Sequence, residues 1–177
     1  RFVVLCEDDE HSRFAHHTLR KLGRQYRELR ILVCPSGREA ADNWVRKHYP
    51  EEVALHRRKA SSQEGLALIV LIDADRLSVD QRHEQLGEAL RSSNLAERGP
   101  SEKVVIWVPK RHIETWIAEL LHGDANEEDD YKNAMRGADY QTAAQRFVEH
   151  VRNAGNYPSG LLPSMSRALD ETARLPQ

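Results

Sequence analysis

The stretch "LALIVLIDADRL", residues 66–77, decides the fold class. Its first seven residues are apolar without alternation, which indicates a strand buried on both faces, as in a parallel sheet covered by helices. Asp73 and Asp75 follow this run directly and flank Ala74. In an extended segment, residues two apart face the same side. The stretch therefore predicts a central strand that ends in a pair of carboxylates.

The rest of the chain repeats the alternation of apolar strands and helical patterns. Further continuous apolar runs at residues 2–6, 29–34 and 103–108 predict three more strands. Helical patterns follow each strand, at residues 11–23, 36–49, 78–93 and 113–121. Ser36 with Glu39 predicts a capping box, Pro50 predicts the start of a separate helix, and Ser78 predicts a helix cap. We expect an α/β fold with a four-stranded parallel sheet flanked by helices.

The length of 177 residues suits a single folded unit with one extension. We expect residues 1–122 to form the core and residues 123–177 to form a C-terminal helical extension packed on it. This extension holds an acidic loop, a helix around residues 140–154 and a short helix capped by Ser164. It could instead dock on a partner.

The composition, with 40% hydrophobic and 31% charged residues and a mean hydropathy of −0.69, is typical of a soluble protein. No apolar run approaches the roughly 18 residues of a membrane span, so we expect no membrane contact and a cytoplasmic location. The net charge of −2 excludes a global attraction to nucleic acid, which leaves local basic patches. Cys6 and Cys34 end two neighbouring apolar runs and are interpreted as buried thiols.

Acidic residues follow three of the four predicted strands. Glu7 follows the first, Asp73 and Asp75 the third, and Glu114 the fourth. The carboxyl ends of parallel strands meet at one edge of a sheet, where ligands bind. Clustered carboxylates repel one another unless a cation intervenes, and Mg²⁺ or Mn²⁺ prefers such oxygen ligands. The alternative is that Asp73 or Asp75 caps the next helix and that Glu7 is an exposed N-terminal acid. Glu114 could likewise be present only because the helix dipole favours an acid in the first turn of a helix.

The segment "VVLCEDDEH", residues 3–11, resembles the opening of a response-regulator receiver domain. Three features disfavour that family. The interval from Glu7 to Asp73 is longer than one compact βαβαβ passage, the loop after Asp73 lacks a Met-Pro-Gly type of continuation, and no Lys-Pro pair ends a fifth strand.

The chain is more similar to the TOPRIM domain, the metal-binding fold of topoisomerases, primases and OLD-family nucleases. Glu7 stands where that family has a glutamate after strand one, and Asp73-Ala74-Asp75 stands at its Asp-x-Asp motif. "RHIETWI", residues 111–117, resembles the Ile-Glu-[Ser/Thr/Asn]-[Trp/Tyr] element of small standalone TOPRIM-like proteins. The resemblance covers about residues 1–122. The chain departs from the family pattern at two positions. Asp8 stands where many members have glycine, and His11 stands where they have an acid.

The resemblance implies a metal-dependent nuclease. Glu7, Asp73 and Asp75 would bind one Mg²⁺ or Mn²⁺, and Glu114 with Glu10 or His11 would help to hold a second. Lys110 would neutralise charge in the transition state. Residues that would contact nucleic acid, if they are not simply solvated, are Arg46, Lys47, Arg57, Arg58, Lys59 and Arg111. Asp8 and Asp9 are expected to serve the start of the following helix. The other histidines, His112 among them, lack metal-ligand spacing and are discounted.

OLD-type systems further imply an ATPase partner and a role in bacterial defence against phage. The target would be nucleic acid, with DNA favoured over RNA, and the chain could be an oligomer. The competing hypothesis is a catalytically silent TOPRIM-like subunit that recruits a partner. Sequence alone leaves open whether one or two metals bind and whether one strand or both are cut.

Overall fold

The computed structural model describes residues 1–37, 40–153 and 155–176. Its sheet has four strands, β1 (Phe2–Cys6), β2 (Leu29–Val33), β3 (Ala67–Leu71) and β4 (Val104–Trp107). All pairings are parallel, and the order across the sheet is β2-β1-β3-β4. The predicted α/β class and all four predicted strands are confirmed.

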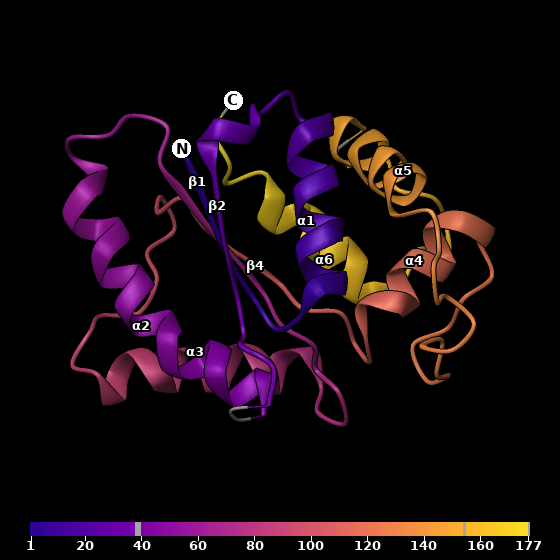
Figure 1. Cartoon of the computed structure of the whole chain (residues 1–177), viewed down its shortest axis with the longest axis horizontal. Coiled ribbons are helices and arrows are strands. Elements are labelled where there is room, and N and C mark those ends of the chain that lie inside the picture. The colour runs from indigo at the N-terminus through magenta and orange to yellow at the C-terminus, as the bar shows by residue number, and fades with distance from the viewer. Residues whose placement is uncertain (38–39, 154, 177) are drawn as a thin grey trace.

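The strand order creates a switch point between β1 and β3. The chain leaves β1 for β2 on one side and then crosses back to add β3 and β4 on the other. Because such crossovers are right-handed, helices after β1 and helices after β2 and β3 cover opposite faces. Figure 1 shows this three-layer arrangement, with α2 and α3 on one side of the strands and α1, α4, α5 and α6 on the other. Ligands of open parallel sheets bind at such a switch point.

One face of the sheet is covered by α1 (Asp9–Lys21), α4 (Ile113–His122), α5 (Tyr140–Arg152) and α6 (Pro163–Thr172). Aromatic rings fill this layer: Phe14, Trp107, Trp116 and Phe147 pack with centroids 5.3 to 6.2 Å apart. The same cluster of buried residues includes Met165 and Leu169 of α6. Residues on both sides of position 122 thus share one continuous hydrophobic core.

The opposite face carries α2 (Ala41–Ala60) and α3 (Val79–Ser92). Val45, Tyr49 and Val53 of α2 and Leu86 and Leu90 of α3 pack on that face of the sheet. A short 3₁₀ helix, Tyr26–Glu28, leads into β2. No helix among the described residues has both the length and the apolar character needed to cross a membrane.

The prediction that Pro50 starts a new helix is wrong, because α2 continues through it. A proline inside a helix removes one hydrogen bond and crowds the preceding turn, at a cost of about 3 kcal/mol. The apolar stripe Val45, Tyr49 and Val53 runs across Pro50 and is fully buried on the sheet, which offsets that cost. The helix begins at Ala41 and not at Ser36, which lies in a turn. Glu39, the other half of the predicted capping box, lies outside the described residues.

Two predicted caps differ in outcome. Ser78 caps α3 as expected, since its Oγ accepts a hydrogen bond from Gln81 N at 3.1 Å. Ser164 does not cap α6, because the N-cap is Leu162 and Pro163 occupies the first helical position. Ser164 is instead buried, and its Oγ accepts a hydrogen bond from Trp116 Nε1 at 2.8 Å. A buried indole N–H needs such an acceptor, and this need outweighs the capping preference of serine.

Cys6 is a buried free thiol, and the adjacent Cys34 is half-buried. Their backbones are linked by a hydrogen bond from Cys34 N to Cys6 O at 3.3 Å. The prediction of a buried thiol is confirmed for Cys6, at the end of β1, and is wrong for Cys34, which directly follows β2 and is half-buried.

Candidate metal centre

Three segments meet at the carboxyl edge of the sheet, after β1, β3 and β4. Beyond the last residues of β3, Ile72 N donates to Trp107 O at 3.1 Å and Ala74 N donates to Pro109 O at 2.8 Å. These bonds prolong the pairing of β3 and β4 past the regular ladder. They therefore hold the Asp73 segment against the turn that carries His112.

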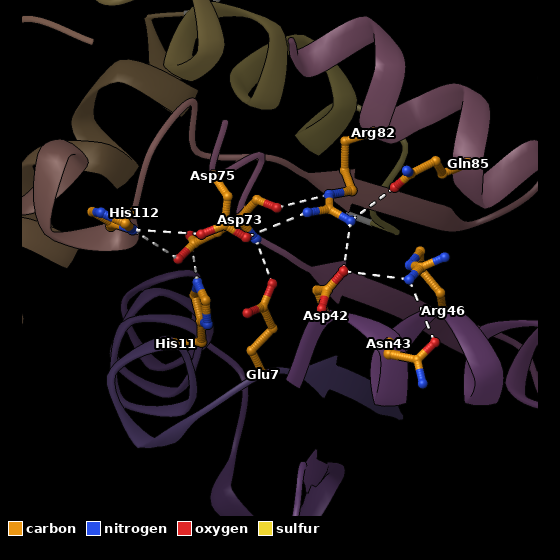
Figure 2. Close-up of polar contacts among 10 residues, drawn as sticks. All are labelled: Glu7, His11, Asp42, Asn43, Arg46, Asp73, Asp75, Arg82, Gln85 and His112. Carbon is orange, nitrogen blue, oxygen red and sulfur yellow. Dashed lines mark hydrogen bonds and ion pairs between the residues drawn. The ribbon is translucent and has the colours of Figure 1, made fainter. Parts of the chain in front are cut away.

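Asp73, Asp75 and His112 form a group whose donor atoms all lie within 4.8 Å of one another. Nδ1 of His112 is 3.7 Å from Asp73 Oδ2 and 3.9 Å from Asp75 Oδ1 (Figure 2). The side chains of Asp73 and His112 are 6% and 12% exposed, whereas that of Asp75 is 48% exposed. Asp73 and His112 are thus largely buried, and solvent reaches the group at Asp75.

The second oxygen of each aspartate is held by a neighbouring cationic side chain. Asp73 Oδ1 lies 2.9 Å from His11 Nε2, and Asp75 Oδ2 accepts a hydrogen bond from Arg82 Nη2 at 3.4 Å. The remaining oxygens, Asp73 Oδ2 and Asp75 Oδ1, face His112 (Figure 2). Partners of this kind are what orient the ligands of metal sites in proteins.

The residues present fit a divalent cation. Nδ1 of His112 is buried and has no hydrogen-bond partner among the described residues, and 3.7 Å is too long for a hydrogen bond to Asp73. Ligand atoms that share one ion at about 2.1 Å lie about 3.0 to 3.4 Å apart. The two distances from His112 Nδ1 are only slightly longer than this, and all three donor atoms lie within 4.8 Å of one another, so the group could hold a metal ion after the side chains draw closer.

Arg82 is the structural centre of this edge. Its side chain is 3% exposed, and its Nε donates to Asp73 O at 2.8 Å. Its Nη1 donates to Gln85 Oε1 at 2.8 Å and to Asp42 Oδ2 at 3.1 Å. Asp75 has a φ of 53°, in the left-handed region that costs most residues roughly 1 kcal/mol or more. The bonds from Arg82 hold the backbone at Asp73 and the carboxylate of Asp75 across this turn.

Glu7 supports Asp73 from β1. Its Oε1 accepts a hydrogen bond from Asp73 N at 2.7 Å, and the side chain is buried. Burial and the charge of Asp73 raise the pKa of Glu7 to about 8. Burial and the neighbouring negative charge thus favour the protonated form of Glu7.

His11 lies fully buried between two carboxylates, with Nε2 beside Asp73 and Nδ1 3.1 Å from Asp8 Oδ1. Burial alone would lower the pKa of His11, but the charges and hydrogen bonds of Asp73 and Asp8 raise it well above its usual value. Burial would raise the pKa of Asp8, yet its bonds to His11 lower it to about 2. Asp8 is also the N-cap of α1 and accepts from His11 N at 2.9 Å, as predicted.

The remaining predicted site residues lie outside the group of three donors. Glu114 is in the first turn of α4, where burial and the charge of Asp73 raise its pKa. Glu10 is in the first turn of α1, where its Oε1 lies 3.9 Å from Arg13 Nη1.

Within the group, burial and the charge of Asp73 raise the pKa of Asp75. The charges of Arg82, His112 and Lys132 act in the opposite direction and lower it by less.

A groove of about 560 Å³ opens beside the group and is lined by both Asp75 and His112. Three cationic side chains, Arg76, Arg82 and Arg111, also line it, together with the acidic Asp42 and Asp130. Arg111 lines the groove, whereas its neighbour Lys110 is not among the lining residues. Two members of the candidate metal group, Asp75 and His112, and three guanidinium groups thus share one concave surface.

The predicted basic residues of α2 are divided between the two ends of this helix. Arg46 and Lys47 are near its start, where Arg46 Nη2 is 3.4 Å from Asp42 Oδ2. Arg57, Arg58 and Lys59 are in the last turn, and Arg57 pairs with Glu102 at 2.7 Å. A helix that connects parallel strands runs antiparallel to them, and 20 residues span about 30 Å. The cluster 57–59 therefore lies at the far edge of the sheet from the candidate metal centre.

The sequence pattern does not indicate a role for His112 or Arg82. His112 lacks metal-ligand spacing along the chain, and the expectation that it is not a ligand is corrected by its position facing both aspartates. Its signal is its place at the carboxyl end of β4, the same criterion that selected Glu114. Arg82 has no comparable signal, because an arginine in an early turn of a helix is ordinarily solvated.

Comparison with protein families, with curated proteins and with solved structures gave no match to this chain. A functional inference for this chain therefore depends on the chemistry of the site and not on kinship.

Proposed function

We propose that this chain is a metal-dependent phosphodiesterase that cleaves nucleic acid. The observation that carries the proposal is the joint placement of the Asp73, Asp75 and His112 group and of Arg76 and Arg111 on one groove. Phosphodiester hydrolysis needs a water nucleophile and neutralisation of charge on the phosphate, and these residue types serve both needs.

Asp73, Asp75 and His112 would hold the ion. Mg²⁺ or Mn²⁺, when bound there, supplies a Lewis acid that polarises the phosphate and favours ionisation of water. The exposed side of Asp75 leaves the approach from the groove open. Arg76 and Arg111 would bind phosphate oxygens, for which the planar guanidinium group is well suited. His11, Arg82 and Glu7 keep Asp73 and Asp75 in place.

A TOPRIM-like relationship is part of this proposal. It is supported by the all-parallel four-stranded sheet and by Glu7 and Asp73 at the adjoining ends of β1 and β3. DNA as the target, an ATPase partner and a role in phage defence follow from that relationship and are proposed with it. A receiver-like phospho-acceptor role is disfavoured, because Asp73 is 6% exposed and its oxygens face His11 and His112.

The test is a cleavage assay on plasmid DNA, single-stranded DNA and RNA, with Mn²⁺, Mg²⁺ or EDTA. We expect cleavage by the wild type that requires metal and is lost in Asp73→Asn. The matched control is Asp80→Asn, because Asp80 is 86% exposed and lies outside the groove. Wild-type protein that binds metal yet cleaves none of the three substrates, with and without an ATPase partner, would refute the nuclease and favour the silent interaction subunit.

A further inference from the structure

We propose that the site selects a divalent transition-metal ion over Mg²⁺ and that His112 Nδ1 is the ligand that makes the selection. This inference rests on the proposed function, since it concerns the same site and names the class of ion that the site takes.

The donor set is the first argument. Mg²⁺ prefers oxygen ligands in an octahedron and retains several waters. Imidazole nitrogen is a poor ligand for Mg²⁺ but a good one for first-row transition ions. Nδ1 of His112 faces Asp73 Oδ2 and Asp75 Oδ1 and has no other partner among the described residues. One of the three donors is therefore a nitrogen positioned for an ion that accepts it.

The neighbouring carboxylates do not supply an all-oxygen alternative. Glu7 Oε1 is taken by the backbone N–H of Asp73, and Asp8 Oδ1 is taken by His11. Within the described parts of the chain, the group of mutually close donor atoms contains two carboxylates and no third. Within this group a hard ion would have only the carboxylates of Asp73 and Asp75 and would fill the rest of its coordination shell with water, without using His112.

Charge at the site is the second argument. Mg²⁺ is bound by negative potential, and the buried guanidinium of Arg82 reduces that potential. Arg82 lies 3.4 Å from Asp75 Oδ2 and donates to Asp73 O. A transition ion gains the additional bond to His112 and is less dependent on net charge. Both arguments favour the same class of ion.

The experiment uses Co²⁺ and Mg²⁺ as probes, by calorimetric titration of the metal-free wild type, His112→Ala, His112→Asp and the control His122→Ala. His122 is exposed at the opposite end of the same helix. We expect Co²⁺ to bind wild type at least about tenfold more tightly than Mg²⁺, with a visible absorption band from the bound Co²⁺. His112→Ala should weaken Co²⁺ binding by at least about tenfold and leave Mg²⁺ binding nearly unchanged. His112→Asp replaces the nitrogen ligand by oxygen and should reduce the preference for Co²⁺ over Mg²⁺, whereas His122→Ala should leave that preference unchanged.

Equal affinity of the wild type for the two ions would overturn the inference, and this comparison needs no variant that could misfold. Unchanged Co²⁺ affinity and absorption in a folded His112→Ala would also overturn it, as would failure of both ions to bind. The cleavage assay decides the proposed function separately. Cleavage supported equally by Mg²⁺ and Co²⁺ refutes only the ion preference, whereas selective Co²⁺ binding without any cleavage refutes only the nuclease.

Discussion

Replacing Arg82 by alanine removes the side chain that connects both candidate aspartate ligands to the body of the protein. The hydrogen bond that contributes most to stability is the 2.8 Å bond from Arg82 Nε to Asp73 O. Without it this buried carbonyl is left unsatisfied, which costs about 1 to 3 kcal/mol of folding free energy. The contacts to Asp42 and Asp75 contribute less, because these carboxylates are 27% and 48% exposed and regain water. We expect Arg82→Ala to lower the free energy of unfolding by about 3 kcal/mol.

The measurement is urea denaturation of the metal-free protein, followed by Co²⁺ titration of the folded variant. Loss of an outer partner of a metal ligand typically weakens binding by about 10- to 100-fold. Arg82→Lys should recover part of the stability, since one ammonium can reach Asp73 O but cannot bridge all four acceptors. Arg91→Ala on the same helix is the control, because the ion pairs of Arg91 among the described residues are all with exposed glutamates and its loss should change metal affinity little. A folded Arg82→Ala with wild-type stability and wild-type Co²⁺ affinity would refute the reasoning.

Three further predictions concern pH, the core and a buried hydrogen bond. The folded-state pKa of Glu7 is raised to about 8, so folded protein without metal binds more protons than unfolded protein above pH 4.5, and stability should fall as pH rises toward 8. Denaturation midpoints in EDTA at several pH values measure this fall, and Glu7→Gln should reduce it. Phe147→Ala should cost roughly 3 to 5 kcal/mol and leave one cooperative transition by circular dichroism and tryptophan fluorescence, whereas separate transitions would make the C-terminal helices an independent unit. Ser164→Ala should cost about 1 to 3 kcal/mol in thermal or urea unfolding, because Trp116 Nε1 loses its buried acceptor, and Ser166→Ala is the control.

The strands and most helices could be predicted from local pattern. A run such as residues 66–72 is apolar on both faces, which is typical of a strand in a parallel sheet covered on both sides by helices. The position of Asp73 directly after that run places it at the carboxyl edge whatever the neighbouring strands are. The same reasoning placed Glu7 there, and the capping pattern at Ser78 was sufficient because a cap involves residues only three apart.

The composition of the candidate centre depends on contacts between segments distant in sequence. Glu7, expected among the ligands, accepts a hydrogen bond from Asp73 N because β1 and β3 are adjacent in this strand order. His11, another expected ligand, has each ring nitrogen beside a carboxylate. His112 and Arg82 enter because the β4 turn and α3 lie against the Asp73 segment.

At Pro50 and Ser164, tertiary packing outweighs the local preferences of proline to break a helix and of serine to cap one. At Pro50 a continuous buried stripe outweighed the local preference for a helix break, and at Ser164 a buried indole took the hydroxyl that a cap would have used. The sequence was sufficient for features set by residues close along the chain. The tertiary structure decided those that depend on the distance between side chains from different elements, because periodicity and spacing carry no information about that distance.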